Sequence, residues 1–336
     1  MRTTRITLST LSALTLMASS AWSATDATPG VAQRWLAART TAQQSASCLP
    51  AQPFYWEIGD ARQTLASGQA GDNAPTAHTR MAIASASKWL YSAYVAERHN
   101  GQLLPEDVMF LNFESGYTRF HACRQDDTVG SCETSVLNGF GLRDWQTVGK
   151  FDYNGGHMQK HATLMGLGGL DNAALAQAMT RTLGLTSLLQ PLSYNQPQLA
   201  GGAETTANTY SRFLQKILQG DLKIAALLGS HPVCTNPTQC PNQAVYTPIP
   251  LDESWHYSVG HWVEDDPKVG DGAFSSPGAF GFYPWIDANK QFYGILARED
   301  HNGAGDTSNP TDRPAIASVQ CGRQIRAAWM TGRVQN

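Results

Sequence analysis

The chain has 336 residues, a net charge of -3 and only 15% charged residues, and its seven lysines do not cluster. This composition argues against a protein that binds nucleic acid or an anionic membrane surface, because both need concentrated positive charge. Beyond the N-terminal segment no apolar stretch is long enough to span a bilayer, so we expect no membrane-spanning segment.

The N-terminal segment is typical of an export signal. Two arginines precede an apolar run from Ile6 to Met17, and small residues follow it. We therefore predict that residues 1–24 are a signal peptide and that the mature protein is periplasmic or extracellular. Cleavage after Ala21 or after Ala24 fits the pattern, and the choice stays open.

Apolar periodicity and turn-forming residues predict the secondary structure of the rest of the chain. The predicted elements are, in order, a helix over 32–45, strands over 54–59 and 64–68, helices over 85–99, 173–183 and 207–218, strands over 255–263, 272–286 and 291–298, and a helix over 315–330. Strands lie at both ends of the chain, so the sheet must be assembled from distant segments. The C-terminal strands have short connections, which favours antiparallel pairing.

The six cysteines suggest disulfides in an exported chain, although six cysteines allow fifteen pairings. Two pairs are each separated by a short segment rich in turn-forming residues and are the natural local pairs. The remaining pair would tie the two ends of the chain together. The expected disulfides are Cys123–Cys132, Cys234–Cys240 and Cys48–Cys321.

We expect no metal and no cofactor. Metal binding is the alternative role for the cysteines, but no CxxC or HxxxH spacing supports it, and the nine histidines are scattered. The acidic clusters at 264–266 and 299–300 are most simply solvated loop charges, so we assign them no chemistry.

A serine–lysine pair at the start of the helix predicted from residue 85 is the strongest chemical signal. Ser85 and Lys88 are three residues apart, which on a helix puts their Cβ atoms roughly 5–6 Å apart on one face. A lysine amine that burial or nearby cations keep neutral can take the proton of the serine. The positive end of the helix favours the resulting alkoxide. Alone the pair is weak evidence, because a capping serine and a solvated lysine give the same pattern.

Four further blocks follow the pair in order, and they give it context. They lie at 151–157, 164–185, 200–206 and 257–262. Together with the stretch from Ile83 to Lys88, this order resembles the serine β-lactamase and penicillin-binding protein superfamily. The match is to the class C β-lactamase-like branch, which includes family VIII esterases and 6-aminohexanoate-dimer hydrolases.

The resemblance implies an α/β (α+β) fold of the β-lactamase-like type, in which helices flank an antiparallel sheet and a mostly helical region is inserted. Residues 25–101 and 206–336 would form the α/β domain, and residues 102–205 the helical and loop insertion. The active site would lie in the cleft between these two parts.

The resemblance also implies roles for individual residues. Ser85 would be the nucleophile and Lys88 its base partner, with Tyr153 moving the proton as a phenolate or through its hydroxyl. A buried aromatic residue with a hydrogen-bonded hydroxyl is the alternative for Tyr153. Asn154 and Gly155 stand where the family usually has Ser-Asn, and they are the expected substrate-binding residues of this block.

The third family motif, Lys/His-Thr-Gly on a strand edge, aligns best with the stretch from Ser276 to Gly278. Both of these residues are expected to bind substrate, and Gly278 would let the substrate lie against the strand backbone. The backbone N–H groups of Ala279 and Ser85 would form the oxyanion hole. A simple Pro-Gly turn between two strands is the alternative.

The resemblance implies hydrolysis through an acyl-serine intermediate, on a small-molecule or oligomeric ester or amide. Because Ser276 replaces the family's cation, a neutral substrate is favoured, and a carboxylesterase fits best. An arginine from elsewhere in the chain would restore that charge. The alternatives are a β-lactamase or D-alanyl-D-alanine carboxypeptidase, a transacylase, and a non-catalytic penicillin-binding-like protein. The sequence predicts no oligomeric state.

Overall fold

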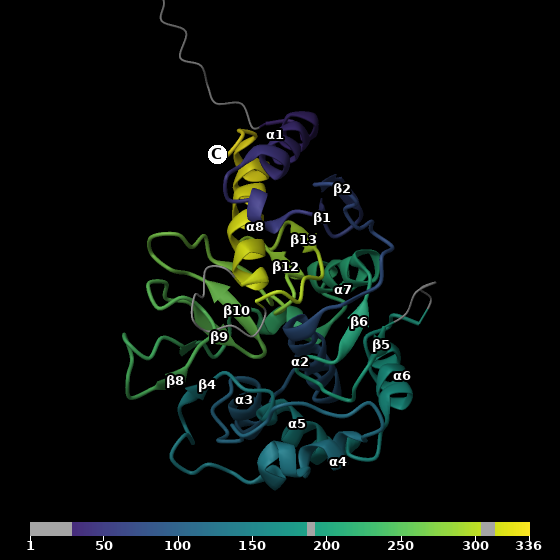
Figure 1. The fold of residues 1–336 in the computed structure, drawn as a ribbon, viewed down its shortest axis with the longest axis vertical. Helices are drawn as coiled ribbons and strands as arrows, with labels where there is room; N and C mark the ends of the chain where they lie inside the picture. The colour runs from purple at the N-terminus through teal and green to yellow at the C-terminus, as the bar shows by residue number, and fades with distance from the viewer. Residues whose placement is uncertain (1–28, 187–191, 304–312) are drawn as a thin grey trace, which may run out of the picture.

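The computed structural model describes residues 29–186, 192–303 and 313–336 (Figure 1). The signal peptide predicted at 1–24 lies outside these residues. Within them, no helix has both the length and the apolar character needed to cross a membrane.

An eight-stranded sheet, antiparallel throughout, holds the upper part of the molecule together (Figure 1). Its order is β2-β1-β13-β12-β11-β10-β9-β7. The strands are β1 Phe54–Gly59, β2 Thr64–Ala70, β7 Val233–Cys234, β9 His256–Ser258, β10 His261–Glu264, β11 Ala273–Ser275, β12 Tyr283–Ile286 and β13 Tyr293–Ala297. The N-terminal β1 pairs with the C-terminal β13, with Glu57 opposite Ile295, so distant segments do assemble the sheet.

Two of the predicted strands are divided, which corrects the sequence prediction. The strand predicted over 255–263 is a hairpin, in which β9 and β10 meet at Val259 and Gly260. Both turn residues have positive φ, 41° and 78°, as a two-residue hairpin turn requires. Valine rarely adopts this conformation, so the apolar run hid the turn. The strand predicted over 272–286 is interrupted by the loop 276–282.

Helices cover both faces of this sheet. α1 (Val31–Gln44) lies along α8 (Pro314–Thr331), and α8 packs against β12 and β13 (Figure 1). On the other face α7 (Ala207–Gln219) packs against β13. There α2 (Ser87–Arg98) packs against β10, where Trp89 stacks on His261 with ring centroids 5.6 Å apart.

The acidic cluster at 264–266 is partly buried, so the prediction of solvated charges was wrong. Glu264 is fully buried beneath α8 and pairs with Arg326 at 3.0 Å and Arg323 at 3.1 Å. Burial alone would raise the pKa of Glu264, but the two arginines outweigh it and lower the pKa to about 2. Asp266 is buried as well and accepts backbone N–H groups of its own loop. Glu264 and Trp262 are two residues apart on β10, so their side chains lie on the same face of the sheet. This alternation was the sequence signal that Glu264 is buried.

The segment between α2 and α7 occupies the lower part of Figure 1. Its helices are α3 Pro105–Leu111, α4 Val129–Glu133, α5 Gly156–Ala162 and α6 Asn172–Thr182. Short strands link it to the rest of the chain: β4 (Phe151–Asp152) pairs with β8 (Ala244–Tyr246), and β6 (Ala203–Thr205) pairs with β3 (Met81–Ala82) and β5 (Ser193–Tyr194). We keep the division into 25–101 plus 206–336 and an insertion 102–205 as a proposal.

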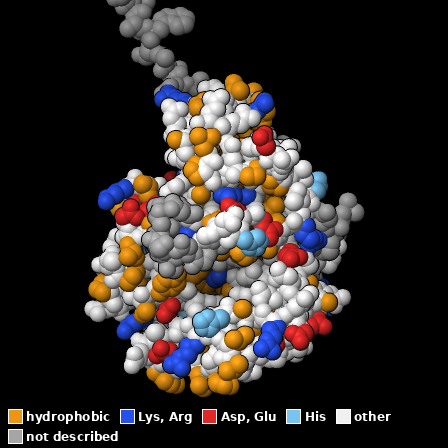
Figure 2. Space-filling view, in the orientation of Figure 1, with side chains coloured by type: hydrophobic (Ala, Val, Ile, Leu, Met, Phe, Trp, Pro, Cys, Tyr) orange, Lys and Arg blue, Asp and Glu red, His pale blue; other side chains and the backbone are white. Residues whose placement is uncertain are grey.

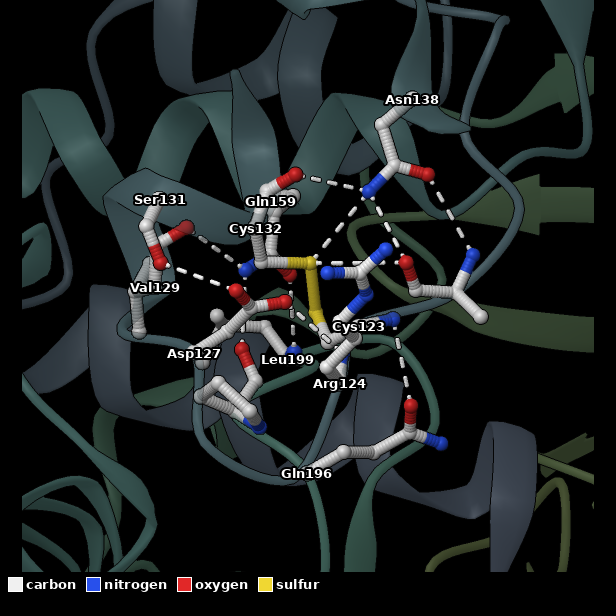
Figure 3. Close-up of a disulfide and its surroundings, with 12 residues drawn as sticks. Cys123, Arg124, Asp127, Val129, Ser131, Cys132, Asn138, Gln159, Gln196 and Leu199 are labelled. Atoms are coloured by element: carbon white, nitrogen blue, oxygen red, sulfur yellow. Dashed lines mark hydrogen bonds between the residues drawn. A yellow bond between two sulfur atoms is a disulfide. The ribbon is translucent and has the colours of Figure 1, made fainter. Parts of the chain in front are cut away.

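All six cysteines are paired in the structure. The disulfides are Cys48–Cys321, Cys123–Cys132 and Cys234–Cys240, the three pairs expected from the sequence. Figure 3 shows Cys123–Cys132, beside which the amide of Asn138 donates to the carbonyl oxygen of Cys132 at 2.7 Å. Cys48–Cys321 fastens the chain before β1 to α8.

Candidate active site

Ser85 and Lys88 are adjacent where the chain enters α2. Ser85 lies in the short 3-10 helix Ala84–Ala86, and Lys88 in the first turn of α2. The Nζ atom of Lys88 is 2.8 Å from the Oγ atom of Ser85 and donates to the carbonyl oxygen of Ala200, also at 2.8 Å. Ala84 has φ of 43°, a strained conformation for a residue with a side chain, and such strain often occurs at functional sites.

Lys88 is buried, with 4% of its surface exposed. Burial lowers the pKa of Lys88 to about 7, because water no longer solvates the ammonium form. The rings of Tyr153 and Phe113 lie 4.7 Å and 6.0 Å from Nζ, and no carboxylate of the described residues forms an ion pair with it. At neutral pH a large fraction of Lys88 is therefore the free amine, the form that accepts a proton.

Tyr153 completes the polar side of the site. It follows β4, its backbone N–H donates to Tyr246, and its ring stacks on Trp262 with centroids 5.4 Å apart. Burial raises the pKa of Tyr153, and its contacts with the side chains of Ser85 and Trp262 offset this only in part. The hydroxyl therefore stays protonated at neutral pH. Of the two expected forms of Tyr153, this favours the hydroxyl over the phenolate.

The loop containing Ser276 and Gly278 supports the nucleophile turn. The Oγ atom of Ser276 donates to the carbonyl oxygen of Ser85 at 3.0 Å. A Cβ at Gly278 would overlap the carbonyl oxygen of Ile83, so this close approach by itself requires a glycine. The loop connects β11 to β12, which agrees with the alternative interpretation of this stretch as a Pro-Gly turn between two strands. Neither Ser276 nor Gly278 lines the pocket beside Ser85, and their expected contact with substrate stays a prediction.

Ala279 follows in a turn closed by the N–H of Gly281, which donates to the carbonyl oxygen of Gly278 at 2.8 Å. Ala279 and Ser85 both line the same pocket. The N–H of Ala279 has no acceptor among the described residues. It is therefore available to a group bound beside Ser85.

Asn154 and Gly155 are not among the residues that line the pocket beside Ser85, and their expected contact with substrate stays a prediction. The side-chain amide of Asn154 is used within the protein: its oxygen accepts the N–H of Gly156 at 2.9 Å, and its NH2 donates to the carbonyl oxygen of Phe120 at 3.3 Å. Gly155 precedes α5 and packs against the ring of Phe120. Asn154 thus shapes the turn into α5.

A pocket of about 90 Å³ that opens to solvent lies beside Ser85. Its lining is mostly apolar and consists of Ser85, Tyr153, Pro248, Ile249, Trp262, Pro277, Ala279, Arg313, Ala315 and Ile316. No motif marked Pro248, Ile249 or Ile316, because isolated apolar residues of this kind are usual in a core.

Arg313, just before α8, is the one cation in the pocket lining. Its Nη1 donates to the carbonyl oxygen of Pro248 at 3.2 Å, and its buried Nε has no hydrogen-bond partner among the residues that the structure describes. No carboxylate of the described residues pairs with it. Sequence reasoning allowed for such an arginine but had no signal to choose this one.

Acidic and basic side chains are interspersed over the face in Figure 2, with no large area of one sign. Across 29–186, 192–303 and 313–336, no group of three or more His, Cys, Asp or Glu side chains is arranged to hold a metal ion.

No protein-family model and no curated protein sequence matches the chain. Solved structures do match. The D-amino acid amidase of Ochrobactrum anthropi SV3 superimposes with a TM-score of 0.60 at 12% identity, over 82% of this chain and 95% of its own. A candidate β-lactamase of Bacteroides dorei superimposes with a TM-score of 0.57 at 20% identity, over 81% of this chain and 93% of its own. The hydrolase EstCE1, which has promiscuous acyltransferase activity, superimposes with a TM-score of 0.56 at 11% identity, over 87% of this chain and 98% of its own.

The chain has a β-lactamase-like fold. Its antiparallel sheet and flanking helices are those expected from the resemblance in the sequence. At these identities the likeness extends to the fold alone, so any activity must be argued from the site of this chain.

Proposed function

We propose that this β-lactamase-like protein is an exported serine hydrolase that cleaves a neutral ester or amide through an acyl-serine intermediate, most simply as a carboxylesterase. The observation that carries the proposal is the 2.8 Å approach of the Lys88 Nζ to the Ser85 Oγ. The buried amine has a pKa lowered to about 7, so it is a base at the pH where an exported enzyme works.

The residues divide the reaction as follows. The lone pair of Lys88 takes the hydroxyl proton of Ser85 while Oγ bonds to the substrate carbonyl carbon, and the N–H groups of Ser85 and Ala279 hold the oxyanion. The proton then passes through the hydroxyl of Tyr153 to the leaving group as its bond to carbon breaks. Water next gives a proton to Lys88 and attacks the acyl carbon. As the bond between that carbon and Oγ breaks, Lys88 returns the proton to Oγ, which releases the acid and restores the Ser85 hydroxyl.

The pocket supports a small, uncharged acyl or alcohol group. Its lining includes Pro248, Ile249 and Ile316, and apolar linings of this kind bind apolar groups by removing their surface from water. Ser276 carries no positive charge, and its hydroxyl donates to the backbone carbonyl oxygen of Ser85. A short neutral ester therefore fits the strand edge better than a carboxylate does.

Arg313 favours a second candidate, an enzyme acting on a substrate with a carboxylate, such as a β-lactam or a D-alanyl peptide. Its guanidinium lines the pocket just before α8 and has a buried N–H without a partner in the described part of the chain. Guanidinium groups bind carboxylates through paired hydrogen bonds. Arg313 thus stands as a replacement for the cation missing at Ser276.

Export to the periplasm or the medium belongs to the same proposal. It is supported by the signal-like segment over 1–24 and by three disulfides, which persist in oxidising compartments.

The test is a substrate panel assayed with the wild type and Ser85→Ala. It contains p-nitrophenyl esters of increasing chain length, a chromogenic cephalosporin and short amide oligomers. Preferred turnover of a short ester, lost in Ser85→Ala, supports the carboxylesterase, whereas preferred turnover of the cephalosporin supports the second candidate. Acyl transfer to an added alcohol in preference to water indicates a transacylase. No turnover and no acyl-serine adduct with any member indicates a non-catalytic binding protein and overturns the proposal.

A further inference from the structure

We propose that His157 is a positioning residue that holds Tyr153 against Ser85 by fixing the peptide group between Asp152 and Tyr153. The proposal rests on the proposed acyl-serine reaction, in which Tyr153 relays a proton. His157 itself is not among the residues that line the pocket.

The hydrogen bonds of His157 define one tautomer. The ring is fully buried, its Nε2 is 3.0 Å from the carbonyl oxygen of Asp152, and its Nδ1 is 2.7 Å from the hydroxyl of Ser115. A carbonyl oxygen only accepts, so Nε2 carries the hydrogen and donates to Asp152. Nδ1 is then the acceptor, and Ser115 donates its hydroxyl proton to it. Both ring nitrogens are thereby occupied, Nε2 by the backbone of Asp152 and Nδ1 by the side chain of Ser115.

His157 stays neutral while it does this. Burial lowers the pKa of His157 to about 3, because the imidazolium form would lose its hydration, and the bond to the carbonyl oxygen of Asp152 offsets only part of this. The ring therefore carries no proton to or from the site at neutral pH. Its contribution is geometric.

Phe113 also holds the segment that contains Asp152 and Tyr153. Its carbonyl oxygen accepts the N–H of Asp152 at 3.0 Å, and its ring contacts Tyr153 edge-on, with centroids 5.2 Å apart. It also packs against the ring of His157 at 5.4 Å. Phe113 has φ of 59°, a strained conformation that the surrounding contacts must maintain. The peptide groups before Tyr153 are thus held by Phe113 at Asp152 N–H and by His157 at Asp152 C=O.

Such fixing matters because regular structure does little to place Tyr153. β4 is only two residues long, and Tyr153 lies just beyond it with two glycines soon after. The hydroxyl must nevertheless lie beside Ser85, and a displacement of about 1 Å at a reacting group costs about 100-fold in rate. His157 is the side chain that ties this short segment to the more regular α5.

The experiment compares His157→Ala and His157→Gln with a matched control, His161→Ala. His161 lies on the same helix, is 3% exposed, and bonds to Tyr91 and Asp107. Each variant is titrated with a fluorophosphonate to count competent sites, and kcat and KM for p-nitrophenyl acetate are measured per titrated site, beside the thermal midpoint Tm.

His157→Ala should lower kcat per titrated site about 100-fold with little change in KM. His157→Gln keeps an N–H that reaches the Asp152 carbonyl, so it should recover most of this loss. His161→Ala should lower Tm but leave kcat per titrated site near the wild-type value. Unchanged kcat per titrated site in both His157 variants, or an equal loss in His161→Ala, overturns the proposal.

The same comparison in a Tyr153→Phe background separates positioning from a general effect on the fold. If His157 acts through Tyr153, adding His157→Ala there should cost little further activity. Losses that multiply contradict the proposal. If the wild type itself takes no label at Ser85, the proposed function fails, and the failure is then not one of His157.

Discussion

The two walls of the pocket are built on different principles. On one wall Ser85 lies beside Tyr153, and the buried Lys88 behind it approaches the Oγ atom of Ser85 to 2.8 Å. On the other, Pro248 and Ile249 offer apolar surface, and Arg313 keeps a buried N–H that has no partner within the described residues. The first wall is ordered by the protein's own contacts, whereas the second leaves binding capacity for a substrate.

The difference predicts two kinds of mutational effect. Changes to the first wall should lower the rate for every substrate, because every acyl transfer uses the same atoms. Changes to the second wall should alter the ratio of the kcat/KM values for different substrates. The predictions below test this separation.

Ser85→Ala should have the largest effect. The substitution removes the atom that forms the acyl-enzyme, so kcat for any ester that the wild type hydrolyses should fall by at least about 10⁴-fold. The fold should survive because the change is small and Ser85 is partly exposed. Activity of Ser85→Ala near the wild-type level, at unchanged Tm, would remove Ser85 from the mechanism.

Lys88→Ala and Tyr153→Phe should each cost several orders of magnitude in kcat, and the double variant little more than either alone. The reason is that the two groups move one proton, and groups that act as a unit give non-additive losses. Losses that multiply would place them in separate steps. Near-normal turnover by Tyr153→Phe would exclude Tyr153 from the first wall.

The pH dependence tests the state of Lys88. Its pKa is lowered to about 7, so the amine fraction, and with it kcat/KM, should rise through about pH 7 and level off above it. The raised pKa of Tyr153 should add no further limb near neutral pH. A rise that begins only near the ordinary lysine pKa, or a fall through pH 7, would be inconsistent with a buried amine base.

Arg313→Ala tests the second wall. We expect turnover of a chromogenic cephalosporin to fall by about tenfold or more, since a charged hydrogen bond contributes about 1.5–3 kcal/mol. The ratio of kcat/KM for p-nitrophenyl acetate over that for the cephalosporin should rise accordingly. Equal losses for both substrates would show that Arg313 supports the pocket rather than selecting among substrates.

The disulfides should affect stability more than selectivity. Replacing Cys48 and Cys321 by alanine should lower the free energy of unfolding by about 2–5 kcal/mol, because the link closes most of the chain into one loop. The matched control is replacement of Cys234 and Cys240, whose loop is much shorter. Urea unfolding measures both. An equal or larger loss in the control would contradict this loop-closure argument.

The sequence predicted the first wall better than the second, for physical reasons. Ser85 and Lys88 are close in sequence and lie on one helical turn, so their spacing alone brought them together. Tyr153 and Ala279 required the resemblance to a family, because only the fold brings these segments to Ser85. Arg313 and Phe113 carry no motif, and no local pattern marks a core phenylalanine with positive φ.

The same contrast appears in the fold. The helices and β1 followed their apolar periodicity closely, as α7 and its cap at Thr206 illustrate. The hairpin at Val259 was missed, because a buried valine in a left-handed turn is imposed by tertiary contacts. The hydrogen bonds between the amide of Asn154 and the backbone of Phe120 were not predicted either.

Labelling with a fluorophosphonate, followed by intact mass measurement and peptide mapping, tests the central claim most directly. The account predicts one adduct per chain, located on the peptide that contains Ser85. Labelling should be strongly slowed in Lys88→Ala, because the serine then lacks its base. An adduct on any other serine, or no adduct in a folded protein, would contradict the assignment of Ser85 as the nucleophile.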